Sequence, residues 1–265
     1  MLSELAVQME KSNVLMECHD LRKNYVVRGK KITVLKGVNL SIARGKICII
    51  NGRSGAGKST LLSLLGGLER PTTGSITFKN QRLEKMDNEA LAKIRRDSIG
   101  ILRQSYNLIP SWTASENVEA ALMHIGMTKS DRNTKTRTLL TAMGLADRLD
   151  NLPAELSGGQ QQRVAVARTM ANEPEFILAD EPTGELDTQT ANDIIKILVD
   201  LVKEKNIALV VVTKGDFLIH MAQVMLKSGN NSLEYIETIY HLRKGQLING
   251  GGLAENRERI MRGDF

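Results

Sequence analysis

Several kinds of residue are scarce in this chain of 265 residues, and each scarcity narrows what the protein can be. The two cysteines, Cys18 and Cys48, have no metal-ligand spacing and strand-like neighbours, which favours reduced thiols and a cytosolic chain. No apolar run approaches the ~18 residues of a membrane span. The opening MLSELAVQMEKSN mixes Glu4, Glu10 and Lys11 with apolar residues, unlike a secretion signal. If the protein works at a membrane, we expect another chain to cross it.

Long runs of one charge are also missing, although the net charge is +6 and the pI is near 9.3. This balance would allow an acidic membrane surface or a nucleic acid as a partner. A solvated basic face is the favoured interpretation, because no five or six like charges are consecutive, and we expect no nucleic-acid partner. With 42% hydrophobic and 25% charged residues, the composition is that of a soluble globular chain with one large domain or two modest ones.

The hydrophobic pattern predicts a mixed α/β fold. Residues 14–50 read as short strands joined by turns, and strand-like runs follow at GSITF, IGIL, FILA and IALVVVT. Short apolar strands without alternation, separated by helices, imply a parallel sheet covered on both faces. Between about 106 and 172 helical periodicity replaces the strand signal, which predicts a helical subdomain inserted into the α/β core. A run of three glycines opens the last stretch, which we expect to be a loosely attached tail.

The segment GRSGAGKST lies between the strand ICII and a predicted helix. Its glycines allow backbone N–H groups to wrap a phosphate chain, and the helix N-terminus adds partial positive charge. Lys58 should reach the β and γ phosphates, and the Ser59 hydroxyl should face Mg²⁺. The sequence therefore predicts a nucleotide site formed by Gly52, Arg53, Ser54, Gly55, Ala56, Gly57, Lys58, Ser59 and Thr60.

Two carboxylates follow a second buried strand in FILADEP. Asp180 ends the strand and would reach a Mg²⁺ ion at the carboxyl edge of a parallel sheet. Glu181, one residue later, could polarise the attacking water. Taken alone, such a pair is more often a solvated strand edge. Together with the phosphate loop it predicts the second half of a phosphoryl-transfer site.

A second glycine-containing helix start occurs at LSGGQQQR. Ser157 is a good N-cap, and Gly158 and Gly159 expose backbone amides at the start of a helix, which is a potential phosphate cradle. In isolation, a capped helix with a polar first turn is the favoured interpretation. A second anion-binding helix start, roughly a hundred residues after the first, needs a further explanation.

The order GRSGAGKST, Gln104, LSGGQQQR, FILADEP and GELD resembles the ATP-binding subunit of ABC transporters, over residues of about 14–247. The resemblance implies a P-loop NTPase core with a parallel sheet, an N-terminal antiparallel β-subdomain and the inserted helical subdomain of about 106–172. Residues 1–13 would then be an extension and 248–265 a tail. In that family two subunits dimerise head to tail, with ATP between the phosphate loop of one and the signature helix of the other. Ser157, Gly158, Gly159 and Gln160 would thus serve the partner's ATP.

Further roles come from the resemblance one residue at a time. Tyr25 resembles the aromatic residue that stacks on adenine, the alternative being a core tyrosine. Gln104 resembles the glutamine that touches Mg²⁺ and the attacking water, so Ser59, Gln104 and Asp180 would hold the metal. Asp187 of GELD matches the loop that crosses the dimer interface, although Glu185 stands where a small or polar residue is commoner.

The family also implies a membrane partner. Pro110 and Trp112 lie where the family forms a groove for the coupling helix of an integral membrane subunit, contacted through the helical subdomain. Trp112 is the only tryptophan, and contact with that partner or burial in the helical core are equally good interpretations.

Lys214 departs from the family, which usually has a histidine directly after this strand, contacting the γ-phosphate. We expect Lys214 to face the nucleotide site beside Glu181 and Gln104 as a third catalytic residue, the alternative being a solvated lysine. A flexible ammonium would position water less well than an imidazole, which predicts slow or partner-dependent hydrolysis. Residues 215–238 are longer than is usual, with a turn expected at 228–231, and His220 is no obvious substitute.

The stretches YNLIPSWTASENVEAAL, DNLPAELSGGQQQRVAVARTMANEP and LADEPTGELD most resemble the branch that serves macrolide export, lipoprotein release, antimicrobial-peptide resistance and cell division. The chain would be a peripheral ATPase on the cytoplasmic face that forms a homodimer and drives a separate membrane subunit. Two alternatives remain: a soluble ABC ATPase of the assembly type with no membrane partner, and an impaired subunit that gates a more active one.

Overall fold

A six-stranded sheet forms the centre of the protein in the computed structural model, which describes residues 13–214, 217, 221 and 235–251. Neighbouring strands are parallel except that β10 pairs antiparallel with β9. The expected parallel core is therefore confirmed, with one antiparallel strand at its edge. The order is β10 (Gln246–Asn249), β9 (Ile236–Arg243), β3 (Ile47–Asn51), β8 (Ala208–Thr213), β7 (Phe176–Asp180) and β6 (Ile99–Leu102).

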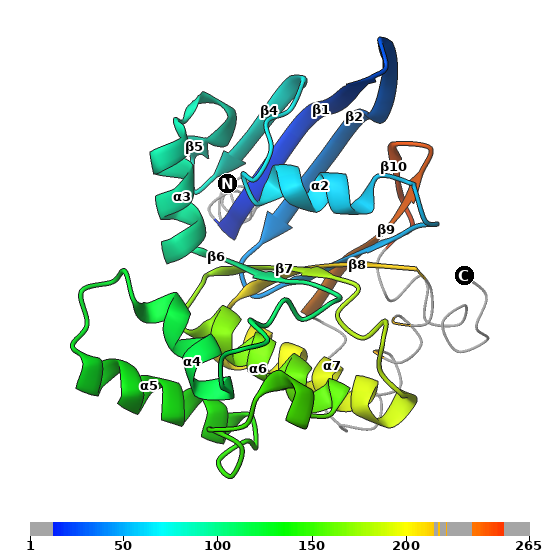
Figure 1. Cartoon of the computed structure of the whole chain (residues 1–265). Coiled ribbons are helices and arrows are strands. Elements are labelled where there is room, and N and C mark those ends of the chain that lie inside the picture. The colour runs from blue at the N-terminus through cyan, green and yellow to red at the C-terminus, as the bar shows by residue number, and fades with distance from the viewer. Residues whose placement is uncertain (1–12, 215–216, 218–220, 222–234, 252–265) are drawn as a thin grey trace, which may run out of the picture.

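A second, antiparallel sheet is built by the first part of the chain. Two long strands, β1 (Val14–Val27) and β2 (Lys30–Ala43), pair with each other, and β1 also pairs with β4 (Thr73–Phe78), which pairs with β5 (Gln81–Arg82). Figure 1 shows this sheet on one side of the central sheet, with α2 (Lys58–Leu65) between the two. The expectation of several short strands over 14–50 was wrong for these two, because register shifts interrupt their alternation without ending them.

The inner strands β3, β8 and β7 of the central sheet are buried on both faces, as the sequence predicted, whereas the edge strand β10 is mostly exposed. In β3 the side chains of Ile47 and Ile49 belong to one hydrophobic core, and those of Cys48 and Ile50 belong to the other. This alternation is what a strand covered on both faces requires. Both cysteines are free and buried, and burial raises the pKa of the Cys18 thiol to about 12.

Helices cover the other face of the central sheet. Figure 1 shows α6 (Gly158–Met170) and α7 (Thr188–Lys205) against it, with α4 (Ala114–Glu119) and α5 (Lys129–Ala142) further out. On the opposite side, α3 (Asn88–Asp97) precedes β6. Short 3-10 turns occupy Leu83–Lys85, Ala120–Leu122 and Pro153–Glu155. Helices α4, α5 and α6 lie in the region of about 106–172 that the sequence predicts to be helical. None of the helices in the described ranges is long and apolar enough to cross a bilayer.

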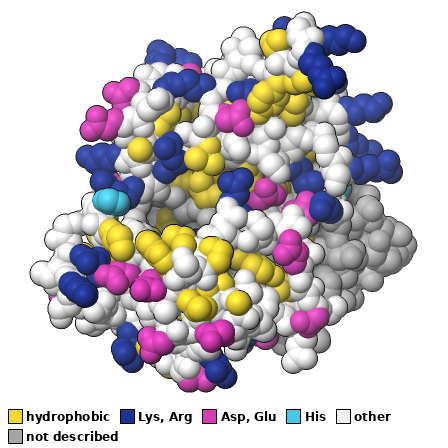
Figure 2. Space-filling view, in the orientation of Figure 1, with side chains coloured by type: hydrophobic (Ala, Val, Ile, Leu, Met, Phe, Trp, Pro, Cys, Tyr) yellow, Lys and Arg dark blue, Asp and Glu magenta, His cyan; other side chains and the backbone are white. Residues whose placement is uncertain are grey.

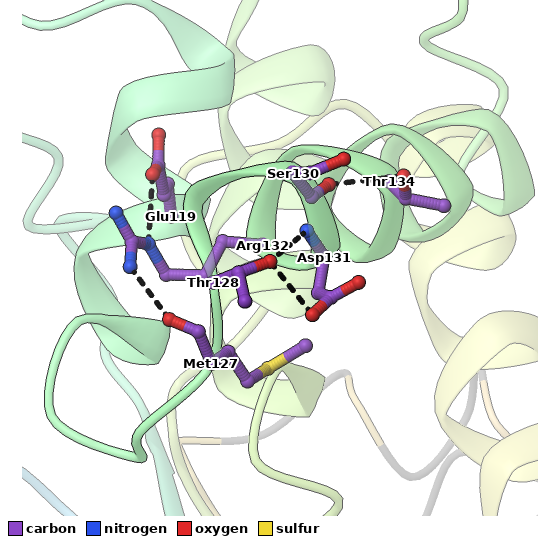
Figure 3. A network of polar contacts seen from close by, with 7 residues as sticks. All are labelled: Glu119, Met127, Thr128, Ser130, Asp131, Arg132 and Thr134. Carbon is purple, nitrogen blue, oxygen red and sulfur yellow. Dashed lines mark hydrogen bonds and ion pairs between the residues drawn. The ribbon is translucent and has the colours of Figure 1, made fainter.

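A polar network fixes the start of α5 to the end of α4 (Figure 3). Thr128 caps α5: its Oγ1 accepts a hydrogen bond from the Asp131 amide at 3.2 Å and donates to Asp131 Oδ2 at 2.7 Å. Arg132 pairs with Glu119 Oε1 at 2.9 Å and donates to the Met127 carbonyl at 3.0 Å. Because both partners of Arg132 precede α5, the arginine holds the connecting segment as well as the two helices.

Candidate nucleotide site

The phosphate loop joins β3 to α2. Gly55 and Gly57 have φ values of 76° and 106°, a left-handed backbone that favours glycine. Gly57 is the N-cap of α2, and no side chain caps the helix there. The first amides of α2 are therefore available to an anion, and the helix dipole favours one. The loop therefore has the left-handed glycines and the open helix start that a phosphate cradle requires, and the binding of phosphate stays a prediction.

Lys58 holds its ammonium inside the curve of this loop. Its Nζ donates to the Gly52 carbonyl at 2.7 Å and to the Arg53 carbonyl at 3.3 Å, and it lies 3.8 Å from Glu181 Oε1. The side chain is 6% exposed. Burial lowers the pKa of Lys58, while the nearby Glu181 carboxylate opposes that shift.

Glu181 lies between two lysines. Its Oε2 is 2.8 Å from Lys214 Nζ, while its Oε1 faces Lys58, and its side chain is 11% exposed. The Lys214 side chain is 52% exposed, and its hydrogen bond to Glu181 raises the pKa of the lysine. The structure thus brings Lys214 to the Glu181 carboxylate while half of the lysine side chain stays exposed to solvent.

The backbone at Glu181 is itself unusual. Its φ of 47° is left-handed, which costs a non-glycine residue on the order of 1 kcal/mol or more. Its N–H donates to the Val212 carbonyl at 2.9 Å, which ties the residue to the end of the neighbouring strand. The two strand ends, β7 and β8, therefore position Glu181 and Lys214 together.

The proposed metal ligands can be tested by the donors they offer. Asp180 ends β7 and is half-buried, and Ser59 is an exposed residue in the first turn of α2. Gln104 follows β6, and its Nε2 lies 3.5 Å from where a Cβ on Gly184 would stand, so it adjoins the loop of Glu181. A cluster of three His, Cys, Asp or Glu side chains is not found among the described residues. One carboxylate with hydroxyl and amide oxygens fits Mg²⁺, which typically keeps waters and phosphate oxygens as its other ligands.

Tyr25 lies within β1, close to the end of the strand, and its side chain is half-buried. Its hydroxyl donates to Glu69 Oε2 at 2.7 Å, and Lys23 Nζ is 4.9 Å from the ring centroid. Burial, together with a hydrogen bond to Glu69, raises the pKa of Tyr25, and a hydrogen bond with Thr60 opposes that shift. The half-buried ring therefore adjoins the first turn of α2, beside the phosphate loop.

The signature segment begins α6 as a capped helix. Ser157 Oγ accepts from the Gln160 amide at 3.3 Å, and Gln160 Oε1 accepts from the Ser157 amide at 2.9 Å. Gly159 is buried rather than exposed, and a Cβ there would lie 2.3 Å from Thr190 Cγ2. Its missing side chain therefore allows α6 to pack against α7. Among the described residues, no hydrogen bond or ion pair joins Ser157–Gln160 to the phosphate loop of its own chain.

One residue that the sequence analysis missed couples α6 to the catalytic loop. Gln162 is fully buried, and its Nε2 donates to the Pro182 carbonyl at 2.6 Å. This bond connects the signature helix to the residue after Glu181. The sequence has three consecutive glutamines here and does not show which of them is buried. Helical periodicity identifies apolar faces, but it does not identify a buried glutamine whose hydrogen-bond partner lies elsewhere in the chain.

Two further missed residues hold the segment after Gln104. Arg168 donates to the carbonyls of Tyr106 and Asn107, both at 2.7 Å, and burial lowers its pKa. Asn117 is fully buried; its Nδ2 donates to the Ile109 carbonyl at 3.2 Å and its Oδ1 accepts from the Ile109 amide at 2.7 Å. The path from Gln104 to α4 is therefore held by side chains of the helical region.

Comparison with known proteins agrees with this geometry. A sequence model described as ABC transporter matches residues 35–184. An uncharacterized ABC transporter ATP-binding protein of Thermotoga maritima is 43% identical over 84% of this chain and 95% of its own length. The lipoprotein-releasing system ATP-binding protein LolD of Geobacter metallireducens is 43% identical over 77% of this chain and 91% of its own length. The macrolide export ATP-binding/permease protein MacB of Marinobacter nauticus is also 43% identical, but the match spans only 30% of that protein.

Solved structures show the same relationship. The dimeric, post-hydrolysis state of the ATP-binding cassette MJ0796 bound to ADP and Pi aligns with a TM-score of 0.78 and 37% identity, covering 90% of this chain and 99% of that one. A further dimeric structure of that cassette aligns with a TM-score of 0.76. The predicted fold and the predicted branch are confirmed by these likenesses. The chain belongs to the ABC transporter family, as one of its ATP-binding ATPase cassettes.

Proposed function

We propose that this chain binds and hydrolyses ATP with Mg²⁺ and thereby powers a separate membrane subunit. The observation that carries the proposal is the position of Glu181, whose carboxylate lies 3.8 Å from the phosphate-loop Lys58 and 2.8 Å from Lys214. A general base, a phosphate-binding lysine and a second cation thus meet at the ends of adjacent strands. That combination is suited to transfer of a phosphoryl group to water.

Each residue has a separate task in this proposal. The amides of Gly52–Thr60 and the Lys58 ammonium bind the β and γ phosphates, and Tyr25 supports adenine. Glu181 accepts the proton of the attacking water, while Gln104 orients that water. Asp180, Ser59 and Gln104 would hold Mg²⁺, which would neutralise phosphate charge. Lys214 donates to the γ-phosphate in place of the usual histidine, and its flexible chain makes hydrolysis slow or partner-dependent.

The active form is a head-to-tail dimer of two copies. The capped start of α6 at Ser157–Gln160 would complete the site of the other copy, because its helix N-terminus favours an anion. The solved cassettes that this chain resembles are described as dimeric, which supports the proposal. In such a dimer the signature segment would bind the ATP of the other copy, although it makes no contact with the phosphate loop of its own chain among the described residues.

The membrane subunit would dock beside the helical region. A cleft of about 620 Å³ is lined by residues of α3 and by His124, which follows the 3-10 turn Ala120–Leu122. Figure 2 shows the hollow between the sheets and the helices, with hydrophobic side chains along its helical side. Trp112 is half-exposed and is not among the described side chains packed against either core, which favours partner contact over a core role. The chain would then lie at the cytoplasmic face of the membrane.

Steady-state hydrolysis of Mg-ATP by the purified full chain tests the proposal, beside Glu181→Gln as the control. We expect a measurable rate that falls on the order of 10²-fold or more in the control while ATP still binds. ATP binding without hydrolysis in either chain would instead support the impaired gating subunit. Purification of the chain in mild detergent tests the membrane partner, and recovery without any multi-span protein would support the assembly-type ATPase.

A further inference from the structure

The long hairpin formed by β1 and β2 carries the whole excess of positive charge of the chain. Residues 21–37, which include the turn between the two strands, contain six lysines and arginines and no aspartate or glutamate. The net charge of all 265 residues is also +6, so acids and bases balance in the rest of the chain. Figure 1 shows the hairpin extending beyond α2, away from α4 and α5. Its charge is therefore presented at one projecting end of the molecule.

The cations at the tip of this hairpin are exposed and unpaired. Further from the tip, Arg22 pairs with Asp20 at 2.7 Å. At the tip, Arg28, Lys30 and Lys31 are exposed, and within the described part of the chain none of the three forms an ion pair or a side-chain hydrogen bond. Figure 2 shows dark-blue side chains along this edge, with yellow hydrophobic ones among them. The tip cations are therefore free to meet an anionic partner.

Aliphatic side chains lie among these cations. Val26 is 75% exposed, Val27 is 51% exposed and Ile32 is 48% exposed. Strand pairing places Val27 beside Lys30 on one face of the hairpin and Val26 beside Lys31 on the other. Single exposed apolar residues are common on soluble proteins, but a group of them marks an interaction site. The tip thus presents apolar groups and positive charge together on both of its faces.

Protection of a sheet edge explains only part of this composition. β2 is an edge strand of its sheet, and lysines on an edge strand discourage pairing with another chain. That role does not require Arg28, which lies in the turn, or the exposed Val26 and Val27, which lie in the inner strand β1. Cations combined with exposed aliphatic groups are instead typical of segments that lie at a bilayer surface.

We propose that the tip of the β1–β2 hairpin binds the surface of a bilayer that contains anionic lipid. Val26 and Val27 enter the boundary between headgroups and acyl chains, and Arg28, Lys30 and Lys31 contact the anionic headgroups. This contact involves lipid alone. It is separate from the docking of a membrane subunit beside the helical region, and it does not rest on that docking.

The chemistry of the tip favours lipid over a nucleic acid. Unpaired bases are bound largely by stacking on aromatic rings, and the hairpin has one aromatic side chain, Tyr25. That ring is half-buried, and its hydroxyl donates to Glu69 at 2.7 Å. The exposed aliphatic groups gain nothing from a phosphate backbone. They do gain free energy when they leave water for the acyl boundary of a bilayer.

Co-sedimentation of the purified full chain with vesicles tests the proposal. The vesicles contain phosphatidylcholine, either alone or with about one third phosphatidylglycerol, so that negative charge is the only difference between them. One variant removes the tip charge by Arg28→Asn, Lys30→Gln and Lys31→Gln, in which asparagine suits the left-handed backbone of the turn. The matched control removes equal charge from exposed positions of α5 and α7 by Lys129→Gln, Arg137→Gln and Lys196→Gln.

We expect the parent chain to bind only the anionic vesicles, and to bind them less tightly as salt is added. Loss of the three tip cations should weaken binding on the order of 100-fold, at about fivefold for each cation near an anionic surface, and the control should weaken it far less. Val26→Ser with Val27→Ser leaves the charge unchanged and should weaken binding roughly tenfold. ATP affinity should be the same in every chain, because none of these positions belongs to the nucleotide site.

Three results would overturn the inference. The first is a parent chain that does not bind the anionic vesicles. The second is equal weakening by the tip variant and its control, which would show an effect of net charge alone. The third is a Val26→Ser, Val27→Ser chain that binds as tightly as the parent while polyuridylate displaces the vesicles, which would assign the tip to a nucleic acid. Hydrolysis of ATP has no part in these measurements, so a failure here leaves the proposed function standing.

Discussion

The two glycine-containing helix starts, at Gly52–Thr60 and Ser157–Gln160, look alike in sequence and are built differently. In the phosphate loop, Gly55 has a left-handed backbone, and a Cβ there would meet nothing within 4 Å. In the signature segment, Gly159 has no such backbone requirement, but a Cβ would collide with Thr190. One glycine supplies conformational freedom and the other supplies room for packing. In the function proposed above, the first segment binds phosphate within its own chain, whereas the second would present its helix start to the other copy.

The largest expected effect is on ATP binding by a single chain, which should depend on the phosphate loop and not on the signature segment. Lys58→Met should weaken ATP binding by the monomer on the order of 10²-fold, because a charge-assisted phosphate contact is lost. Ser157→Ala should leave monomer binding unchanged and weaken only the ATP-dependent dimer. Calorimetry with an ATP analogue that is not hydrolysed measures the first effect. A loss of monomer affinity in Ser157→Ala would show that both segments act in one chain.

Packing at the signature segment gives the next largest effect. Gly159→Ala should lower the free energy of unfolding by about 2 kcal/mol, because the new methyl group overlaps Thr190 Cγ2. Thr190 cannot simply rotate, since its Oγ1 donates to Asp187 Oδ2 at 2.6 Å. Adding Thr190→Ser, which keeps the hydroxyl and removes the methyl, should restore most of the loss. Denaturant titration of the three chains measures this, and failure of the rescue would contradict the packing argument.

Gly55→Ala should have a smaller effect on stability and through a different cause. We expect a loss of about 1 kcal/mol from the left-handed backbone, with no steric contribution because the space is open. Thermal unfolding beside Gly159→Ala measures the difference. The comparison fails if a change at Thr190 also rescues Gly55→Ala, or if Gly55→Ala proves the more destabilising of the two.

Lys214→His should have the smallest effect, seen only in rate. An imidazole is shorter and more rigid than a lysine chain, so water would be positioned better and hydrolysis should rise several-fold, on the order of 1 kcal/mol in the barrier. Steady-state rates at saturating Mg-ATP measure it, with ATP affinity as the control. An unchanged rate would show that the lysine does not limit hydrolysis.

Much of the fold was predictable because its signals are local. The runs ICII, FILA and IALVVVT predict buried strands, each followed by a loop that carries candidate site residues. The structure confirms these strands as β3, β7 and β8. The lengths of β1 and β2 were not predictable from alternation, since their register shifts move side chains from one face to the other. The turn expected at 228–231 and His220 fall outside the described residues.

The motifs of the site were predictable from the sequence, but the residues that hold these motifs in place were not. The spacing of glycines in the phosphate loop, and the position of two carboxylates after a buried strand, are visible in the sequence. The phosphate loop and the carboxylates after β7 could therefore be placed without the structure. Gln162, Arg168 and Asn117 act on carbonyls that are distant in the chain or buried beneath a loop, and only three-dimensional contact reveals them. The role of Gly159 in packing depends in the same way on a neighbour 31 residues later, at Thr190.

The way the chain holds Ile109 has a consequence for amide exchange with solvent deuterium. The Ile109 N–H is protected by the Asn117 side chain, whereas the amides of β3 are protected by pairing with strands on both sides. Exchange at β3 should therefore require global unfolding, while a local opening around Asn117 should suffice at Ile109. We therefore expect the segment that follows Gln104 to open and close many times during one lifetime of the folded core.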